Sequence, residues 1–96
     1  EGISREDMDA FALESLKRAQ HAIRSGAFKP EIVGVPVAGK GGEVLVVDDE
    51  QPLNAKPEKI PTLKPAFKKD GTVTAANSSS ISDGASAIVL TRESVA

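Results

Sequence analysis

Four small polar residues, Asn77-Ser78-Ser79-Ser80, are the stretch best suited to chemistry, because they place one amide and three hydroxyl groups in a row. Between Thr74 and Ile88 the only large apolar side chain is Ile81. Small residues let backbone approach a ligand closely, and serine or asparagine at a helix start adds polar groups beside exposed amides. The stretch predicts either a narrow polar slot for an extended, amide-bearing ligand or close packing of a helix on a strand. The residues alone leave both open.

Other polar residues give weaker signals. Five lysines are candidates for holding phosphate groups, although such side chains more often form a solvated face: Lys56, Lys59, Lys64, Lys68 and Lys69. Asp48-Asp49-Glu50 fits a hydrated strand end better than a metal site, and His21 is expected on the polar side of a helix. The chain has no Cys, which excludes disulfides and thiolate zinc sites. We therefore predict no metal site.

A long helix is predicted at the start of the chain, from Arg5 to Arg24. Ser4 followed by Asp7 approximates a capping box, and Ser25-Gly26 is a plausible stop. Apolar residues recur at spacings of three and four, which is the pattern of a helix with one buried face. They are Met8, Phe11, Ala12, Leu16, Ala19 and Ile23.

A β-hairpin is predicted next, with strands at Ile32–Val37 and Glu43–Val47. Gly39-Lys40-Gly41-Gly42 between them is a turn signal and lacks the spacing of a phosphate-binding loop. Residues 51–71 hold four prolines and five lysines, which forbids a long helix or a central strand there. Leu63 and Phe67 are expected to anchor this region.

The end of the chain predicts a short helix at 78–86, a buried strand at Ala87–Leu90 and the start of another helix at Thr91. The fold class is therefore α/β. The net charge of -2 gives no reason to expect nucleic acid or an anionic membrane as partner. No apolar run approaches the roughly 18 residues of a transmembrane helix. With 96 residues the chain has the size of one small domain, and its start at Glu1 leads us to expect a piece of something longer.

A family resemblance joins these segments. GTVTAANSSSISDGASAIVL, residues 71–90, resembles the thiolase segment GTVTAxNASxxxDGAAAxxL. GISREDMDAFALESLKRAQHAIRSGAF is similar to the helix that precedes this segment in thiolases, and DEQPLNAKPEKIPTLKPAF is similar to their loop domain. EIVGVPV and KGGEVLVVDDE fit the strands between. The resemblance covers essentially the whole chain and is closest to acetyl-CoA acetyltransferases.

The resemblance implies a fragment of the layered thiolase fold. Residues 1–30 would be a helix of the N-terminal domain, 31–76 a portion of the loop domain, and 77–96 the short helix and core strand of the N-terminal domain. Thiolases condense or cleave acyl-CoA through an acyl-cysteine, with further groups in Asn-Glu-Ala-Phe, Gly-His-Pro and Cys-x-Gly segments, none of which occurs here. The resemblance thus implies a chain that is catalytically incompetent alone.

The resemblance also implies coenzyme A (CoA) as a substrate of the parent enzyme and no prosthetic group. Ser79 would contact the pantetheine amide, Ala75 would line its slot, and Phe67 and Leu63 would belong to the apolar part of the CoA groove. The arginine or lysine with which thiolases often meet the CoA phosphate falls near Pro52-Leu53-Asn54, and Lys56 or Lys59 would have to substitute for it.

Three functional readings remain open from the sequence. The first is a thiolase fragment that contributes part of the CoA groove, with homo-oligomers as in parent dimers or tetramers. The second is an autonomous, non-catalytic binder of CoA or acyl-CoA, and the third an oligomerising fragment. The family resemblance implies an intracellular location, either cytoplasmic or organellar. It does not indicate which of these compartments holds the protein, or the length of the acyl chain.

Overall fold

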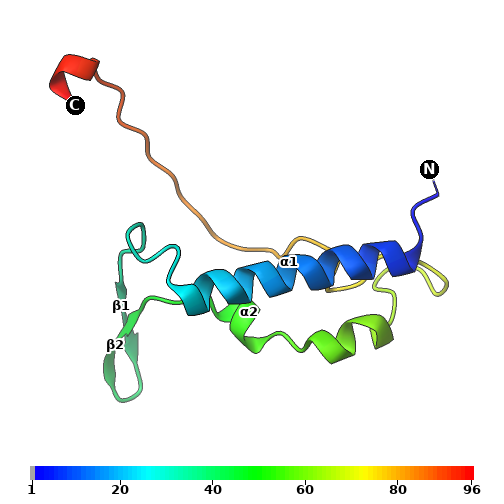
Figure 1. The fold of residues 1–96 in the computed structure, drawn as a ribbon. Helices are drawn as coiled ribbons and strands as arrows, with labels where there is room; N and C mark the ends of the chain where they lie inside the picture. The colour runs from blue at the N-terminus through cyan, green and yellow to red at the C-terminus, as the bar shows by residue number, and fades with distance from the viewer. Residues whose placement is uncertain (1) are drawn as a thin grey trace.

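The computed structural model describes residues 2–96 and combines helices with a small antiparallel sheet (Figure 1). Its longest element is α1, Arg5–Ser25, which runs across the molecule. The predicted capping box is present, because Ser4 accepts a hydrogen bond from the Asp7 amide and the Asp7 carboxylate accepts one from Ser4. Gly26 ends the helix with φ 70°, in the left-handed region that glycine tolerates best.

The predicted hairpin is confirmed, with bounds shifted by a few residues. Strands β1, Val35–Gly39, and β2, Gly42–Val46, pair antiparallel from Val35 opposite Val46 to Gly39 opposite Gly42. Lys40-Gly41 forms the two-residue turn, and Gly42 has φ 115°. The hairpin projects away from α1 as a separate arm (Figure 1).

The proline-rich region contains no long helix and no strand among the residues described, as predicted, but it is less extended than expected. It forms α2, Glu50–Asn54, and the 3-10 helix η1, Pro57–Thr62. Asp49 caps α2 by accepting a hydrogen bond from the Gln51 amide. Together α2 and η1 run back along one side of α1, with η1 near the start of α1 and α2 nearer its end (Figure 1).

The last sixteen residues differ from the sequence prediction. The expected helix at 78–86 and the expected strand at Ala87–Leu90 are not formed, and residues 81–96 are exposed. They leave α1 as an arm that ends in a short 3-10 helix, η2, Glu93–Val95 (Figure 1). A strand needs a neighbour to pair its backbone groups, and the part of the chain described here offers none to residues 87–90. A short helix without tertiary packing is likewise too costly to nucleate.

The two arms make the molecule open. Its radius of gyration is 18.2 Å, whereas a compact domain of this length would have about 12–13 Å. Among residues 2–96 Ile60 is the only buried apolar residue, and Asp9 and Thr74 are the buried polar ones. The buried residues therefore lie where α1 meets η1 and the loop around Thr74, beside the groove described next.

Helix α1 also carries an ion pair on its exposed surface. Arg18 Nε donates to Glu14 Oε1 at 2.9 Å, one helical turn apart, and both side chains are exposed. The hydrogen bond from Arg18, with the charge of Lys17 nearby, lowers the pKa of the Glu14 carboxyl. This pair stays on the outer surface of the helix and contacts no other element through its hydrogen bonds.

A candidate ligand groove along the first helix

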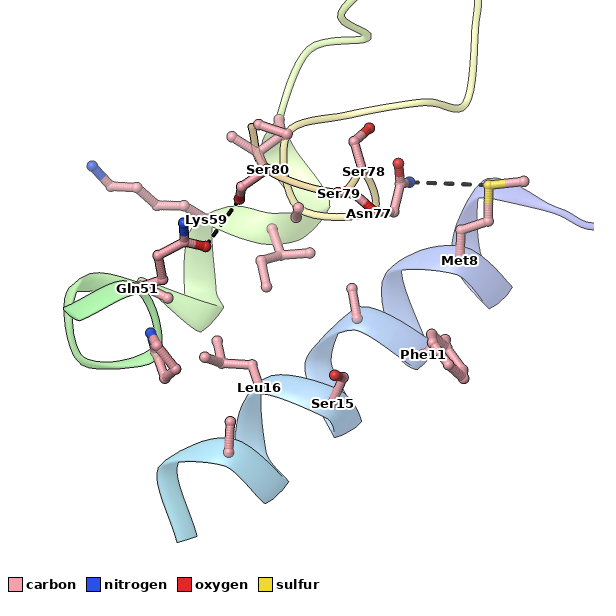
Figure 2. Close-up of a pocket in the computed structure, with 18 of the residues that line it drawn as sticks. Met8, Phe11, Ser15, Leu16, Gln51, Lys59, Asn77, Ser78, Ser79 and Ser80 are labelled. Atoms are coloured by element: carbon pink, nitrogen blue, oxygen red, sulfur yellow. Dashed lines mark hydrogen bonds between the residues drawn. The ribbon is translucent and has the colours of Figure 1, made fainter. Parts of the chain in front are cut away.

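A groove of about 1090 Å³ lies between three segments of the chain: α1, the α2–η1 segment, and residues 75–80 (Figure 2). The α1 side is mainly the apolar stripe that the sequence predicted. Met8, Phe11, Ala12, Leu16 and Ala19 all line the groove, with Ile3, Asp7 and Ser15 beside them. Residues three and four apart share one helix face, which is why a single helix supplies this long apolar wall.

The second wall, from Gln51 to Leu63, is attached to α1 by side-chain bonds to its backbone. Near its start the Gln20 amide donates to the Pro52 carbonyl at 2.9 Å. Near its end Arg5 Nη2 donates to the Leu63 carbonyl at 2.9 Å and to the Ile60 carbonyl at 3.3 Å. Ile60, at the Arg5 end, is 6% exposed and lines the groove.

The third wall is shaped by Asn77, whose side-chain amide bonds to two backbone groups that precede it in the chain. Its Oδ1 accepts from the Thr74 amide at 2.7 Å, and its Nδ2 donates to the Thr72 carbonyl at 2.9 Å. Nδ2 also lies 3.9 Å from Met8 Sδ on α1 (Figure 2). Asn77 therefore stabilises the loop, which favours its prediction as a cap over a catalytic role.

The three serines differ in how their hydroxyl groups are used. Ser78 Oγ donates to the Thr74 carbonyl at 2.7 Å, and Ser80 Oγ donates to Gln51 Oε1 at 2.9 Å, which joins the third wall to α2 (Figure 2). Ser79 Oγ has no hydrogen-bond partner among residues 2–96, and Ser79 lines the groove. Of the three hydroxyl groups, that of Ser79 is the one left available to a ligand.

Three of the four predicted binding residues are brought together. Ser79, Ala75 and Leu63 all line the groove, although Leu63 comes from a different wall. Phe67 does not line it and is 87% exposed. A turn closed by the hydrogen bond from the Gly71 amide to the Lys68 carbonyl follows Phe67, and the bond from the Ala66 amide to the Val73 carbonyl closes the loop in which Phe67 lies.

Both positively and negatively charged residues line the groove. Lys56 and Lys59 line the second wall and Asp7 lies on α1, and neither lysine forms an ion pair within residues 2–96. The same part of the chain contains no group of three or more His, Asp or Glu side chains placed to hold a metal ion. No helix within it has the length and apolar character needed to cross a membrane.

Sequence reasoning missed the residues that attach one wall to another: Arg5, Gln20 and Gln51. Arg5 and Asp9 carry a signal in their spacing of four, because such pairs face each other on a helix. The carbonyls that Arg5 reaches are 55 and 58 residues away in the chain, so no local pattern indicates them. The same holds for the 32 residues between Gln20 and Pro52.

Comparison with known proteins identifies the family of the chain. Residues 1–94 match the family model of the thiolase N-terminal domain. An acetyl-CoA acetyltransferase from Yarrowia lipolytica is 51% identical over 90 residues, which cover 94% of this chain and 23% of that protein. The solved acetyl-CoA acetyltransferase from Syntrophomonas wolfei superposes with a TM-score of 0.73 at 47% identity, over 83% of this chain and 20% of that one.

A further solved structure is a thiolase from Ascaris suum in complex with coenzyme A, with a TM-score of 0.66 and 46% identity over 82% of this chain and 20% of its own. The chain thus spans about a fifth of the length of the relatives it matches. The match of the family model over nearly every residue, together with these identities, means that the chain belongs to the thiolase N-terminal domain family.

Proposed function

We propose that this chain supplies one side of the CoA-binding groove of a thiolase of the acetyl-CoA acetyltransferase type, and that it is catalytically incompetent alone. The observation that carries the proposal is the unpaired hydroxyl of Ser79 beside Ala75 and Leu63 on the walls of one groove. The apolar face of α1 opposite these residues suits the methylene segments of a pantetheine chain, whose amides need polar partners such as a serine hydroxyl.

The rest of the proposal concerns the whole protein. Residues 1–30 and 77–96 would belong to the N-terminal domain and residues 31–76 to the loop domain, in an intracellular homo-oligomer. The absence of Cys leaves this chain without the nucleophile on which acyl transfer in this family depends. We expect no measurable thiolysis of acetoacetyl-CoA by the purified 96-residue chain, and a rate above the buffer control would contradict catalytic incompetence.

The binding part is tested by titrating the 96-residue chain with CoA and following its amide resonances. One side of a groove should bind more weakly than about 1 mM, which corresponds to only about 4 kcal/mol. Ser79→Ala should weaken binding roughly 2- to 12-fold, the effect of losing one neutral hydrogen bond, while leaving the thermal midpoint unchanged. Ser82→Ala is the matched control, because Ser82 is an exposed serine outside the groove.

The outcomes separate the competing functions. Equal CoA affinity in wild type and Ser79→Ala would remove Ser79 from the site and overturn the proposal. Micromolar affinity of the wild-type chain would favour an autonomous CoA-binding module instead. A lowered thermal midpoint with unchanged affinity would make Ser79 a structural residue whose loss costs about 1 kcal/mol, as a lost helix cap does.

A further inference from the structure

Arg5 is the side chain that joins α1 to the end of η1. Its Nη2 donates to the carbonyls of Leu63 and Ile60, at 2.9 and 3.3 Å, and its Nε donates to Asp9 Oδ2 at 2.8 Å. The Ile60 carbonyl also accepts from the Leu63 amide at 3.2 Å. The guanidinium therefore binds the backbone where η1 ends and Leu63 turns toward the groove.

Asp9 fixes the orientation of that guanidinium. Its side chain is 9% exposed and that of Arg5 is 20% exposed, so the pair is shielded from water. The second carboxylate oxygen, Oδ1, is buried and has no hydrogen-bond partner among residues 2–96. A planar guanidinium held at Nε presents its remaining donors in one fixed direction, here toward η1.

The hydrogen bonds of Arg5 and Gln20 attach the second groove wall at both ends. The positions of Arg5 and Gln20 on α1 are about 22 Å apart at 1.5 Å per residue. Between them the residues that line the two walls include apolar ones such as Leu16 on α1 and Ala55 on the second wall, and apolar contact has no fixed direction. The directed bonds are those at the two ends, and at the η1 end they come from Arg5 alone among the side chains described.

We infer that Arg5, held by Asp9, is a positioning residue that sets the distance of the Lys59–Leu63 wall from α1 and so keeps the groove in its ligand-binding shape. This inference rests on the proposed function for the identity of the ligand. The effect of Arg5 on the position of the wall does not depend on that function. Arg5 touches no ligand in this proposal and does not line the groove. It acts through the backbone of Ile60 and Leu63.

The chain contains a matched control for this role. Arg18 and Glu14 form the same kind of pair on the same helix, with Nε to carboxylate at 2.9 Å and a spacing of four. The Arg18 side chain is 78% exposed and bonds to no other element. Arg18→Gln therefore removes an equivalent intrahelical ion pair without touching the groove.

The experiment measures wall position and ligand affinity separately. The chain has no Cys, so cysteines introduced at Ala10 on α1 and Glu58 on η1, both exposed and outside the groove, take one spin label each. Double electron–electron resonance spectroscopy then gives the distribution of distances between the two labels. In Arg5→Gln this distribution should widen and shift to longer distances. CoA affinity should fall roughly tenfold, which corresponds to about 1.4 kcal/mol. The reason is that a smaller share of the molecules would have the wall at its wild-type distance from α1.

Two further variants keep the test meaningful if Arg5→Gln unfolds, which is a risk because it leaves the Asp9 charge buried without a partner. Arg5→Met combined with Asp9→Leu removes both charges and should retain the helical circular dichroism of α1 while still widening the distribution. Arg5→Lys keeps the charge but replaces the planar guanidinium with a compact ammonium on a flexible stem, so it should give an intermediate width and an intermediate affinity.

Each outcome of these measurements supports or overturns a stated part of the inference. A distribution as narrow in the double variant as in wild type and in Arg18→Gln would overturn the positioning role, whatever CoA does. A widened distribution with unchanged CoA affinity would overturn the link between wall position and binding. If wild type itself binds no CoA, the proposed function fails, and the label distances alone still decide whether Arg5 positions the wall.

Discussion

Asn77 uses both ends of its amide to hold the loop that carries the serines. Asn77→Ala removes an acceptor from the Thr74 amide and a donor from the Thr72 carbonyl. Thr74 is fully buried, so its amide would be left without a partner and without water, at a cost of about 1–3 kcal/mol. We expect faster hydrogen exchange at the Thr74 amide and a lower free energy of unfolding, both measurable by amide exchange in deuterated solvent.

The control for this prediction is Asn54→Ala. Asn54 is exposed at the end of α2 and forms no side-chain hydrogen bond within residues 2–96. It should leave the exchange rate of the Thr74 amide unchanged. An Asn77→Ala chain that protects Thr74 as well as Asn54→Ala does would show that the loop keeps its shape without the amide of Asn77.

At single residues, the sequence was informative where neighbours in the chain are also neighbours in space. Ala75, Ser79 and Leu63 were all named through the family resemblance, and all three line the groove. Ala75 and Ser79 come together because they lie in one short segment, whereas Leu63 comes from another wall. Phe67 could not be placed, because its direction depends on the turn closed between Lys68 and Gly71. The position of Arg5 depends on carbonyls far along the chain, which no spacing reveals.

Helix α1 ends through a backbone arrangement that only glycine adopts without strain. Gly26 at φ 70° donates its amide to the Ile23 and Ala22 carbonyls, and Ala27 donates to Ala22 at 3.0 Å. Gly26→Ala places a methyl group about 3.0 Å from the flexible Lys29 side chain, which can move aside, so the cost comes from the backbone. We expect a loss of about 1 kcal/mol and faster amide exchange over the last turn of α1.

Gly41→Ala is the matched control, since a methyl group at Gly41 meets no atom within 4 Å and its φ is not positive. If both alanine variants leave the exchange of the last turn of α1 unchanged, the left-handed cap contributes nothing to the helix end.

Elements defined by local signals were predicted well, and those defined by distant partners were not. The capping box and Gly26 fix α1 from residues within its own ends, and the two-residue turn fixes the hairpin. The strand expected at Ala87–Leu90 has the right composition, but a strand is stabilised by pairing with another strand. The described residues supply none, so the segment is extended and exposed instead.

As a whole molecule, the chain leaves much apolar surface in water. Ile81, Ile88, Val89 and Leu90 are each at least 85% exposed, and the segment that holds the last three has unpaired backbone. Such a segment is prone to pair with another chain. We therefore expect the average sedimentation coefficient of the 96-residue chain to rise with concentration over the micromolar range.

Ile88→Glu combined with Leu90→Glu should suppress this association, because two carboxylates per chain would have to be buried or brought together on pairing. Ser82→Ala again serves as the neutral control in the same arm. A single monomeric species for wild type at every concentration, with slow amide exchange at 86–90, would contradict the prediction.

The separation of 58 residues between Arg5 and Leu63 has a consequence for the order in which the molecule assembles. Helices form in about a microsecond or less and hairpins in about 1–10 μs, because their contacts are local. Closing a loop of many residues costs more chain entropy and is slower. We therefore expect α1 and the hairpin to form before the groove, whose three walls are joined by contacts between residues far apart in the chain.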